Sequence, residues 1–573
     1  MTTVLTMMLA AAVVLVLVLS AFRTPIRLRR WSLAGLALIA LLHILVDGFY
    51  YVFVPVYILV VLLIVIGLYQ LKKLKTNKAE HGWIKRAASI VWRLAWRLAA
   101  VVLVVGSIIT SWSFGKDNFY PLLFAENSVD YSELGWGDAF DRMNSQLAAD
   151  YAFGDWKALD WNALHNRFAP QFATAEQNRD QNAYYLALRE YVYALPDGHF
   201  GLYGDDLGLR KARIGGGFGL NVMKLDDGRV IASQVFEAGP AQQAGLQWGA
   251  EMLSWNAIPV DAALQQVSTT WFDYPIATLE GQNIQKQNLL TRAPVGEPVT
   301  LTFQNPGSDD VQQLSLTAVD DGMAWFYQSQ QMGLVMKVKD GRRAIADKAV
   351  EFSILPNGYG YLKINYEVPL MSMINPVGVV RSAVIEFIKK DVPGVVIDVR
   401  RNLGGYDSMA PLMMAYFCSE PMFYEKVAYP DDSTDELTGI LDVVLEPSTS
   451  VYTGPVAMLI DNFNISTGEG FPMIMQRLKR GPVIGFYGTY GSFGMSGSSI
   501  RLPGDYIVAY ANGASLDEDG TIQLDSDSAL NGGVLPDMRV LITEDTLRAI
   551  QVEGRDILLE TAIETLQSKQ KNN

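Results

Sequence analysis

The sequence contains very little cysteine and histidine. A single cysteine, Cys418, stands among 573 residues, which excludes an intramolecular disulfide framework and every metal site built from several cysteines. Only four histidines occur and there is no HExxH motif, so we expect no histidine-based zinc hydrolase, no other metal and no organic cofactor. Beyond residue 112 only His165 and His199 remain, and a serine nucleophile with a histidine base is compatible with this count.

Acidic residues are scarce at the start of the chain. The first 112 residues hold 12 lysines and arginines but only Asp47 and Glu80, whereas the rest holds 34 basic and 58 acidic residues. The basic residues flank apolar runs and the large remainder is strongly acidic. This division excludes a single soluble domain, and it excludes a nucleic-acid-binding protein.

The apolar runs at the start of the chain predict a membrane domain. A transmembrane helix needs about 20 apolar residues, and four segments qualify, near residues 3–22, 32–50, 52–71 and 92–113. A cleaved signal peptide is the alternative for the first segment, but its basic start is missing. The basic loops at 23–30 and 72–86 are expected in the cytoplasm, which places residues 116–573 on the periplasmic or extracellular side of the cell membrane.

The remainder changes character twice. Aromatic and aliphatic residues at helical spacing over 134–200 predict a small helical domain. Short strands begin at Ile214, with a hairpin turn at 226–228. After residue 350, strands and helices alternate, which indicates crossover units around a parallel sheet. The strands are expected at 359–366, 394–399, 455–460 and 483–486, and the helices at 376–389, 409–417 and 468–480.

Ser466 is the best candidate nucleophile by position. It follows a buried strand and opens a helix, where free N–H groups and the positive end of the helix dipole favour an oxyanion. The alternative is an ordinary N-cap serine, worth about 1 kcal/mol. Gly404 and Gly405 end another buried strand and could supply a second oxyanion donor, or form an ordinary strand–helix turn. Ser492 lies in a sequence close to G-x-S-x-G, which we interpret as a glycine-rich turn.

The strand-rich segment resembles a PDZ domain. Residues 239–246 (GPAQQAGL) and 249–256 (GAEMLSWN) are similar to the "SPA-x-x-AGL" and "GD-x-I-x-x-ING" motifs of that family, with Gly239 in place of serine. The backbone of Gly216, Gly217, Phe218 and Gly219 could then bind a peptide carboxylate, the peptide adding as a strand. A PDZ-like spacer without a ligand is the alternative.

Several ordered motifs together resemble the S41 family of serine peptidases, the C-terminal-processing and tricorn-like group. The family's "DLR-x-N-x-GG", "S-A-S-E", "G-x-x-T-x-G", "G-V-x-P-D" and "L-x-DGH" motifs correspond to residues 398–405, 466–469, 485–491, 533–537 and 195–199. The resemblance spans roughly residues 134–565. It implies Ser466 as nucleophile, with backbone N–H groups of Thr467 and of Gly404 or Gly405 as oxyanion donors.

The sequence departs from the processing peptidases at their lysine base, which is Ser492 here. The tricorn-like branch has a histidine base at the "DGH" position, which implies His199. That branch also has a glutamate shortly before "G-V-x-P-D", where this chain has Leu530 or Asn531. Asp525 and Asp527 lie nearby. Which carboxylate orients His199 stays open, and Asp527 is our choice.

We therefore expect a multidomain protein. Its parts are a membrane domain of about four transmembrane helices (1–115), a helical domain (116–205), a PDZ-like β domain (206–310) and an α/β peptidase core of the ClpP/crotonase type (311–573). The expected function is that of a membrane-anchored serine endopeptidase that cleaves extracytoplasmic polypeptides, with the PDZ domain binding substrate C-termini. The alternative is a non-catalytic peptide-binding or scaffold protein with a degenerate peptidase site.

Overall fold

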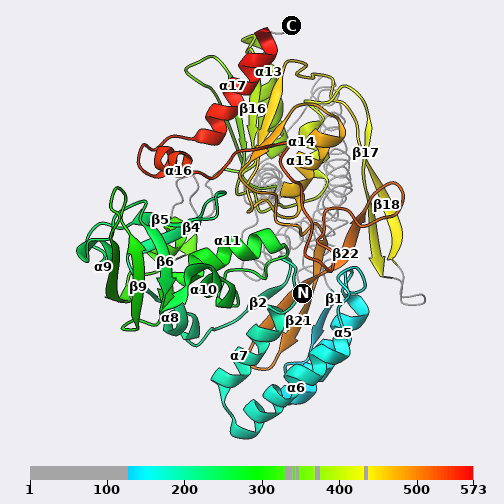
Figure 1. The fold of residues 1–573 in the computed structure, drawn as a ribbon. Coiled ribbons are helices and arrows are strands. Elements are labelled where there is room, and N and C mark those ends of the chain that lie inside the picture. Colours follow the sequence, from blue (N-terminus) through cyan, green and yellow to red (C-terminus); the bar gives the residue numbers. More distant parts are fainter. Residues whose placement is uncertain are drawn as a thin grey trace, which may run out of the picture. The chain divides into compact units, whose positions relative to one another are not determined.

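The computed structural model describes residues 127–329, 338–339, 342–343, 348–367, 375–430 and 437–571 (Figure 1). The chain divides into two compact units, Met1–Leu122 and Leu123–Asn573. The four predicted transmembrane helices lie outside the described residues. Over the residues that are described, none of the helices has the length and apolar character needed to cross a membrane. The membrane domain therefore stays a prediction.

The α/β core is built on a six-stranded sheet in the order β14-β15-β16-β19-β20-β23. All neighbouring pairs are parallel except β14 with β15. The strands are β14 (Val350–Ile354), β15 (Gly360–Ile364), β16 (Val395–Asp398), β19 (Val456–Leu459), β20 (Val483–Gly485) and β23 (Met538–Arg539). Each predicted strand of the core contains one of these, which confirms the predicted α/β alternation.

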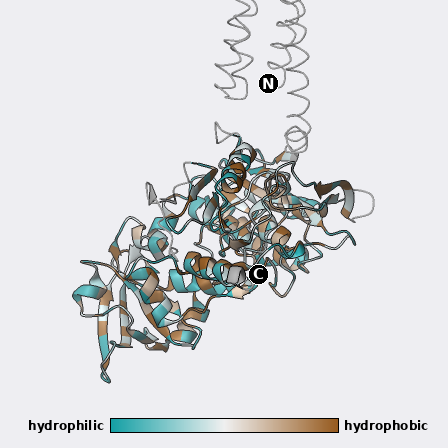
Figure 2. Ribbon diagram, turned by 90° about the horizontal axis from the view of Figure 1, so that it is seen from above, coloured by the Kyte–Doolittle hydropathy of each residue, from teal (hydrophilic) through white to brown (hydrophobic). Residues whose placement is uncertain are grey.

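Helices cover both faces of this sheet, as a parallel sheet requires (Figure 1). They are α13 (Pro376–Lys389), α14 (Met409–Met414), α15 (Thr467–Arg477), α16 (Glu544–Gln551) and α17 (Ile557–Lys571). Val395 and Ile397 of β16 share a core with α13, α14 and α15, whereas Val396 shares a core with α16 and α17. The helix ribbons accordingly alternate between hydrophobic and hydrophilic segments (Figure 2).

A second six-stranded sheet joins the helical segment to the core. Its order is β1-β21-β22-β17-β18, with β2 also paired to β22. The strands are β1 (Asn127–Asp130), β2 (Gly201–Tyr203), β17 (Met422–Pro430), β18 (Leu437–Leu445), β21 (Met495–Leu502) and β22 (Tyr506–Leu516), and the helices are α5 (Trp136–Asp150), α6 (Trp161–Asn178) and α7 (Gln181–Val192). Phe140 and Tyr191 of the helices share one core with Ile500 and Val508 of the strands. The helical segment is thus completed by strands from the far end of the chain.

The strand-rich segment forms an antiparallel sheet in the order β10-β9-β6-β5-β4, with β7 paired to β6, and a small sheet β11-β3-β8. Its strands are β3 (Gly216–Gly217), β4 (Leu220–Lys224), β5 (Val230–Val235), β6 (Glu251–Trp255), β7 (Ile258–Pro259), β8 (Arg292–Ala293), β9 (Pro298–Gln304), β10 (Val311–Thr317) and β11 (Val319–Asp320). Its helices are α8 (Leu209–Ile214), α9 (Pro240–Gln243), α10 (Val260–Gln266), α11 (Leu279–Leu290) and α12 (Ala324–Ser329). Two two-residue strands, β12 (Val338–Lys339) and β13 (Arg342–Arg343), pair with each other.

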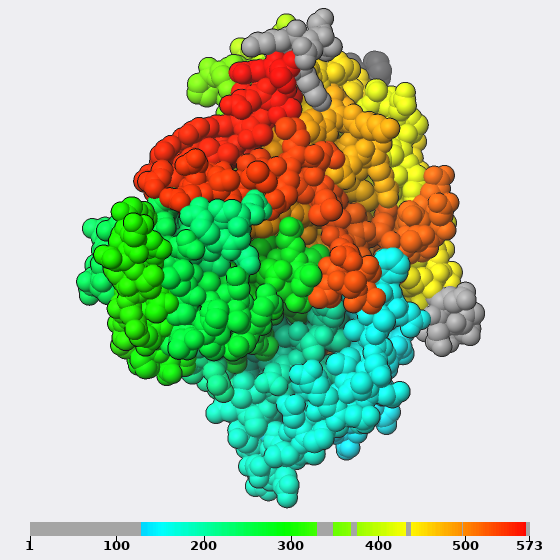
Figure 3. Space-filling view, in the orientation of Figure 1, coloured from blue at the N-terminus to red at the C-terminus, as the bar shows by residue number. Residues whose placement is uncertain are grey.

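The strand-rich segment docks on the C-terminal helices. Met223 and Ile231 of β4 and β5 share a core with Leu547 and Ile550 of α16. In the space-filling view the red C-terminal helices adjoin the green surface of this segment (Figure 3). The turn between β4 and β5 lies where the sequence predicts a hairpin. Assignment of the segment to the PDZ family stays a prediction.

Candidate active site

Ser466 begins α15 in a strained backbone conformation. It is the N-cap residue, with φ 57° and ψ −136°, and its side chain makes no capping hydrogen bond. Such a conformation in a non-glycine residue costs about 1–3 kcal/mol and persists only where surrounding contacts impose it. Here the Ser466 N–H donates to the Ser492 carbonyl at 2.8 Å, and the Glu469 N–H donates to the Ser466 carbonyl at 2.8 Å. Because the half-buried hydroxyl is not used for capping, the ordinary N-cap interpretation does not explain it.

The two glycines after β16 lie directly against Ser466. Gly404 has φ +83°, and a Cβ added to it would lie 2.7 Å from Ser466 Cβ and 3.0 Å from Thr467 N. Only glycine permits this approach. The Gly404 N–H donates to Asn402 Oδ1 at 2.8 Å, so it is not available to an oxyanion. Within the described part of the chain, the N–H groups of Thr467 and Gly405 have no acceptor, and these two are available to an oxyanion.

Ser492 connects the nucleophile to the loop that carries His199. Its hydroxyl accepts a hydrogen bond from the Gly198 N–H at 2.9 Å, while its carbonyl accepts from Ser466. Gly198 is packed so closely that an added Cβ would lie 2.4 Å from Ile465 Cδ1. The side chain at the position of the family's lysine therefore holds the histidine loop beside Ser466. Residues 489–494 form neither helix nor strand, so Ser492 lies in an irregular loop.

His199 is buried and has a carboxylate partner on its own loop. Its Nδ1 lies 3.2 Å from Asp197 Oδ1, which also accepts the His199 backbone N–H at 2.9 Å. The other oxygen of Asp197 accepts from Tyr151 at 2.9 Å. His199 Nε2 is buried without a hydrogen-bond partner among the described residues. With Nδ1 donating to Asp197, Nε2 carries the free lone pair of a general base.

The charges around His199 favour its protonated form. Burial lowers the pKa of His199, but the hydrogen bond and charge of Asp197 and the charges of Asp525 and Asp407 outweigh it, so the pKa lies above its usual value. The reverse holds for Asp197: burial raises its pKa, yet His199 and Lys157 bring it well below the usual value. The pair is therefore stabilised in its charged state.

Asp527 lies away from this arrangement. Its side chain accepts hydrogen bonds from the backbone of Ala529 and Asn531 at 2.8 and 3.0 Å, within its own turn. The carboxylate at His199 is Asp197, and we correct the choice of Asp527 accordingly. The signal for Asp197 was present in the sequence, since it stands two residues before His199 in the same motif.

Two buried carboxyl groups, Asp525 and Glu469, and the partly buried Asp407 surround the site and were not assigned roles from the sequence. Asp525 accepts the Phe493 N–H at 2.7 Å and lies 3.3 Å from the Lys157 ammonium, and burial raises its pKa to about 6. Glu469 accepts the N–H groups of Gly491 and Ser492 at 2.9 and 2.8 Å, and burial raises its pKa to about 7. Asp407 accepts the Thr467 hydroxyl at 2.8 Å.

Two of the four residues that the sequence suggests for peptide binding are part of a small β-sheet. Gly216 and Gly217 form β3, which pairs with β8 on one side and β11 on the other. Phe218 is buried, with its ring 5.6 Å from that of Trp255. The N–H groups of Phe218 and Gly219 have no acceptor within the described ranges. Only these two of the four residues could bind a carboxylate.

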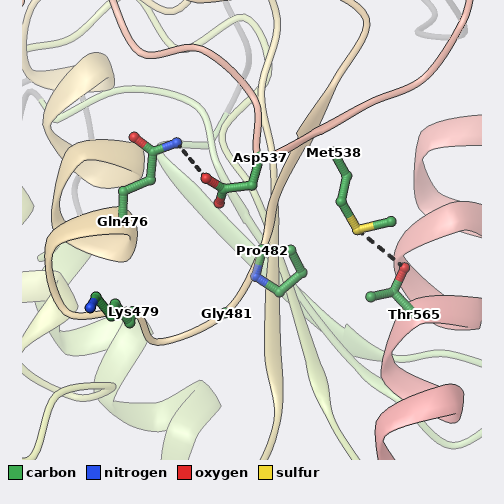
Figure 4. Close-up of a pocket in the computed structure, with 7 residues that line it drawn as sticks. All are labelled: Gln476, Lys479, Gly481, Pro482, Asp537, Met538 and Thr565. Atoms are coloured by element: carbon green, nitrogen blue, oxygen red, sulfur yellow. Dashed lines mark hydrogen bonds between the residues drawn. The ribbon is translucent and has the colours of Figure 1, made fainter.

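A separate cavity lies at the opposite end of α15 (Figure 4). Its volume is about 340 Å³, and it is lined by Gln476, Lys479, Gly481, Pro482, Asp537, Met538 and Thr565. Gln476 donates to Asp537 at 2.9 Å across it. Ten helical residues separate Gln476 from Ser466, about 15 Å along the axis, so this cavity is not part of the candidate active site. Among the residues described, no cluster of histidine, cysteine and acidic side chains could hold a metal ion.

Comparison with known proteins agrees with this architecture. Residues 358–540 match the model of peptidase family S41. Mature CPAF complexed with lactacystin is 14% identical, with 76% of this chain and 98% of that chain covered and a TM-score of 0.54. Mature CPAF is 15% identical, with 72% of this chain and 94% of that chain covered and a TM-score of 0.51. A putative peptidase from Parabacteroides merdae is 17% identical, with 76% of this chain and 97% of that chain covered and a TM-score of 0.42.

The fold and the family match together indicate the class of this protein. It is a multidomain α/β protein with an S41 peptidase-like fold, which the two CPAF structures share. Residues 358–540 match the model of peptidase family S41, which agrees with the family resemblance for that part of the chain.

Proposed function

We propose that this chain is a membrane-anchored serine endopeptidase that cleaves polypeptides outside the cytoplasm. One observation carries the proposal: the Ser466 hydroxyl, unused in capping, lies at a helix N-terminus beside the free N–H of Thr467. The match of residues 358–540 to a peptidase family supports it. The four predicted apolar segments and their basic loops support the membrane anchor and its orientation.

The reaction follows from the groups around Ser466. His199 Nε2 takes the hydroxyl proton as Ser466 Oγ attacks the scissile carbonyl carbon, and the N–H groups of Thr467 and Gly405 stabilise the oxyanion. The imidazolium, held by Asp197, then gives its proton to the leaving amine, which leaves an acyl-enzyme. Water activated by the same imidazole releases the acyl group and restores Ser466.

Substrate selection is proposed to involve the PDZ-like segment. The N–H groups of Phe218 and Gly219 are unused, which suits a C-terminal carboxylate. Next to them, β4 is the edge strand of its sheet, where a peptide could add. Part of that edge is already used, because the Lys224 N–H donates to Gln287 of α11 at 2.7 Å. We therefore propose that only the last residues of a substrate bind here.

Labelling with a fluorophosphonate probe tests the proposed nucleophile. The full-length chain should be modified at Ser466, and Ser466→Ala should abolish labelling because Ser466 is the one described serine that begins a helix with a positive φ. Ser382→Ala is the matched control, since Ser382 is exposed on α13 and donates to the Gly378 carbonyl at 2.9 Å. It should label like the wild type. An unlabelled wild type that still binds peptides with an affinity that Ser466→Ala leaves unchanged would favour the non-catalytic scaffold instead.

A further inference from the structure

The helical segment contributes a fully buried lysine to the surroundings of the active site. Lys157 lies between α5 and α6, and its side chain has no exposure. Its ammonium donates to the Ser526 carbonyl and hydroxyl, each at 2.8 Å, and lies 3.3 Å from Asp525 Oδ1. A buried ammonium is costly unless it is paired and hydrogen-bonded. Two of these contacts are hydrogen bonds to Ser526, and the third is an ion pair with Asp525.

Asp525 stands between this lysine and the histidine loop. Its other oxygen accepts the N–H of Phe493, whose neighbour Ser492 holds Gly198. Burial raises the pKa of Asp525, and the charge of Lys157 partly offsets this rise. The charge of Asp525 in turn raises the pKa of His199. The contacts thus connect Lys157 to Asp525, and Asp525 to the environment of His199.

The charged and titratable groups around His199 come from four parts of the chain. Asp197 lies on its own loop, Asp407 follows β16, and Asp525 follows β22. The helical segment supplies Lys157, which acts on Asp525, and Tyr151, which donates to Asp197. Within the described part of the chain, Lys157 is the one cation besides His199 that lowers the pKa values of both Asp525 and Asp197.

We propose that Lys157 is a positioning residue that keeps Asp525 ionised and in place, so that Asp525 stabilises the imidazolium formed on His199. This inference rests on the proposed function of Ser466 and His199. Without the ammonium, burial drives Asp525 to its neutral form, and an anion near the imidazole is lost. The pKa of His199 then falls, and the imidazolium of the transition state loses stabilisation. The helical segment is therefore part of the catalytic apparatus and not only a cover.

The test measures fluorophosphonate labelling of the full-length chain against pH in Lys157→Met, Asp525→Asn and the double variant. We expect each of the three variants to be labelled about 10-fold more slowly on the high-pH plateau of the profile. The acid limb of the labelling rate should move to lower pH by about one unit. The double variant should match Asp525→Asn, because the proposed effect of Lys157 on the reaction runs through Asp525. Lys211→Met is the matched control, since Lys211 is exposed and pairs with Asp320 at 2.9 Å. Its profile should equal the wild type.

Three outcomes would overturn the inference: a Lys157→Met profile equal to the wild type, an acid limb moved upward, or additive effects in the double variant. If Lys157→Met does not fold, the comparison of Asp525→Asn with the double variant still tests whether Lys157 acts through Asp525. An unlabelled wild type would refute the proposed function instead. In that case the His199 pKa, measured by NMR with 13C-labelled histidine and assigned with His199→Ala, should still be lower in Lys157→Met, and an unchanged pKa refutes the inference.

Discussion

His199 is the residue whose charge state controls the proposed reaction. Only the neutral imidazole accepts the Ser466 proton, so the reaction proceeds above the pKa of His199 and stops as the pH falls through it. Because Asp197, Asp525 and Asp407 together raise this pKa, the acid limb of the labelling rate should lie above about 6.5, the usual value for imidazole. A pH series on the wild type measures it.

Replacing Asp197 with Asn separates the two effects of this carboxylate. Loss of its charge lets burial lower the pKa of His199, so the acid limb should move to lower pH. The NH2 group of the new amide can donate to Nδ1, which favours the wrong tautomer of His199, so the plateau rate should fall by about 10²-fold or more. His165→Ala is the control, because His165 is half exposed and pairs with Asp141 at 2.7 Å. An acid limb that stays in place in Asp197→Asn would contradict the assignment.

The sequence predicts individual site residues only where a local motif contains them. Ser466, Gly404 and His199 each stand in a short motif, and the structure brings their segments together. Lys157 and Asp525 stand in no such motif. They meet across more than 360 positions because β21 and β22 bring the far end of the chain back to the helical segment. Spacing within one segment carries no information on such a contact.

The start of α15 and the end of β16 form one close-packed element pair. An alanine at 404 would place its Cβ 2.7 Å from Ser466 Cβ and 2.8 Å from the Ile465 carbonyl, so the backbone must move. Gly404→Ala should therefore reduce labelling by at least about 10²-fold, because small displacements of reacting groups carry such penalties. The rate of fluorophosphonate labelling measures this directly.

Gly520→Ala provides the control for backbone conformation. Gly520 has φ +85°, close to the +83° of Gly404, but an added Cβ meets nothing within 4 Å. Both variants have the cost of a left-handed alanine, about 1 kcal/mol, and only Gly404→Ala has the clash. We expect Gly520→Ala to label at the wild-type rate. Equal labelling of the two variants would show that the contact between Gly404 and Ser466 is unimportant.

Elements of the parallel sheet are easier to predict than those of the second sheet. The core strands are short apolar runs followed by helical periodicity, and α13 has the predicted bounds. In contrast, β22 contains Asn512 and Gly513, which in a sequence favour a turn. In the structure, the register of β21 against β22 shifts beside this position. The pairing of β1 and β2 with these strands then depends on tertiary contacts that local patterns do not record.

At the scale of the molecule, one buried arginine links the C-terminal helices to the core, in addition to their apolar contacts with the sheet. Arg400 is 1% exposed and donates to Asp398 at the end of β16 and to Asp556 just before α17. The two hydrogen bonds to Asp556 measure 2.8 and 2.7 Å. Asp398 is itself buried, and although burial raises its pKa, Arg400 and Lys363 lower it well below the usual value. Two positive charges, on Arg400 and Lys363, therefore face two carboxylates, and without Asp556 only Asp398 would remain to balance them.

Asp556→Ala should release α17 from the sheet. Removing one partner of a buried charge costs about 3 kcal/mol, and the Leu559 N–H loses its acceptor as well. Hydrogen exchange in peptides covering residues 557–571 of the full-length chain should become faster by about 10²-fold, the factor that corresponds to this energy. Glu560→Ala is the control from the same helix. Its pair with Arg555 at 2.5 Å is exposed on both sides and should contribute little to stability. If the two variants exchange alike, the buried arginine does not hold the C-terminal helices, and the apolar contacts of Leu558 and Leu566 with the sheet are sufficient.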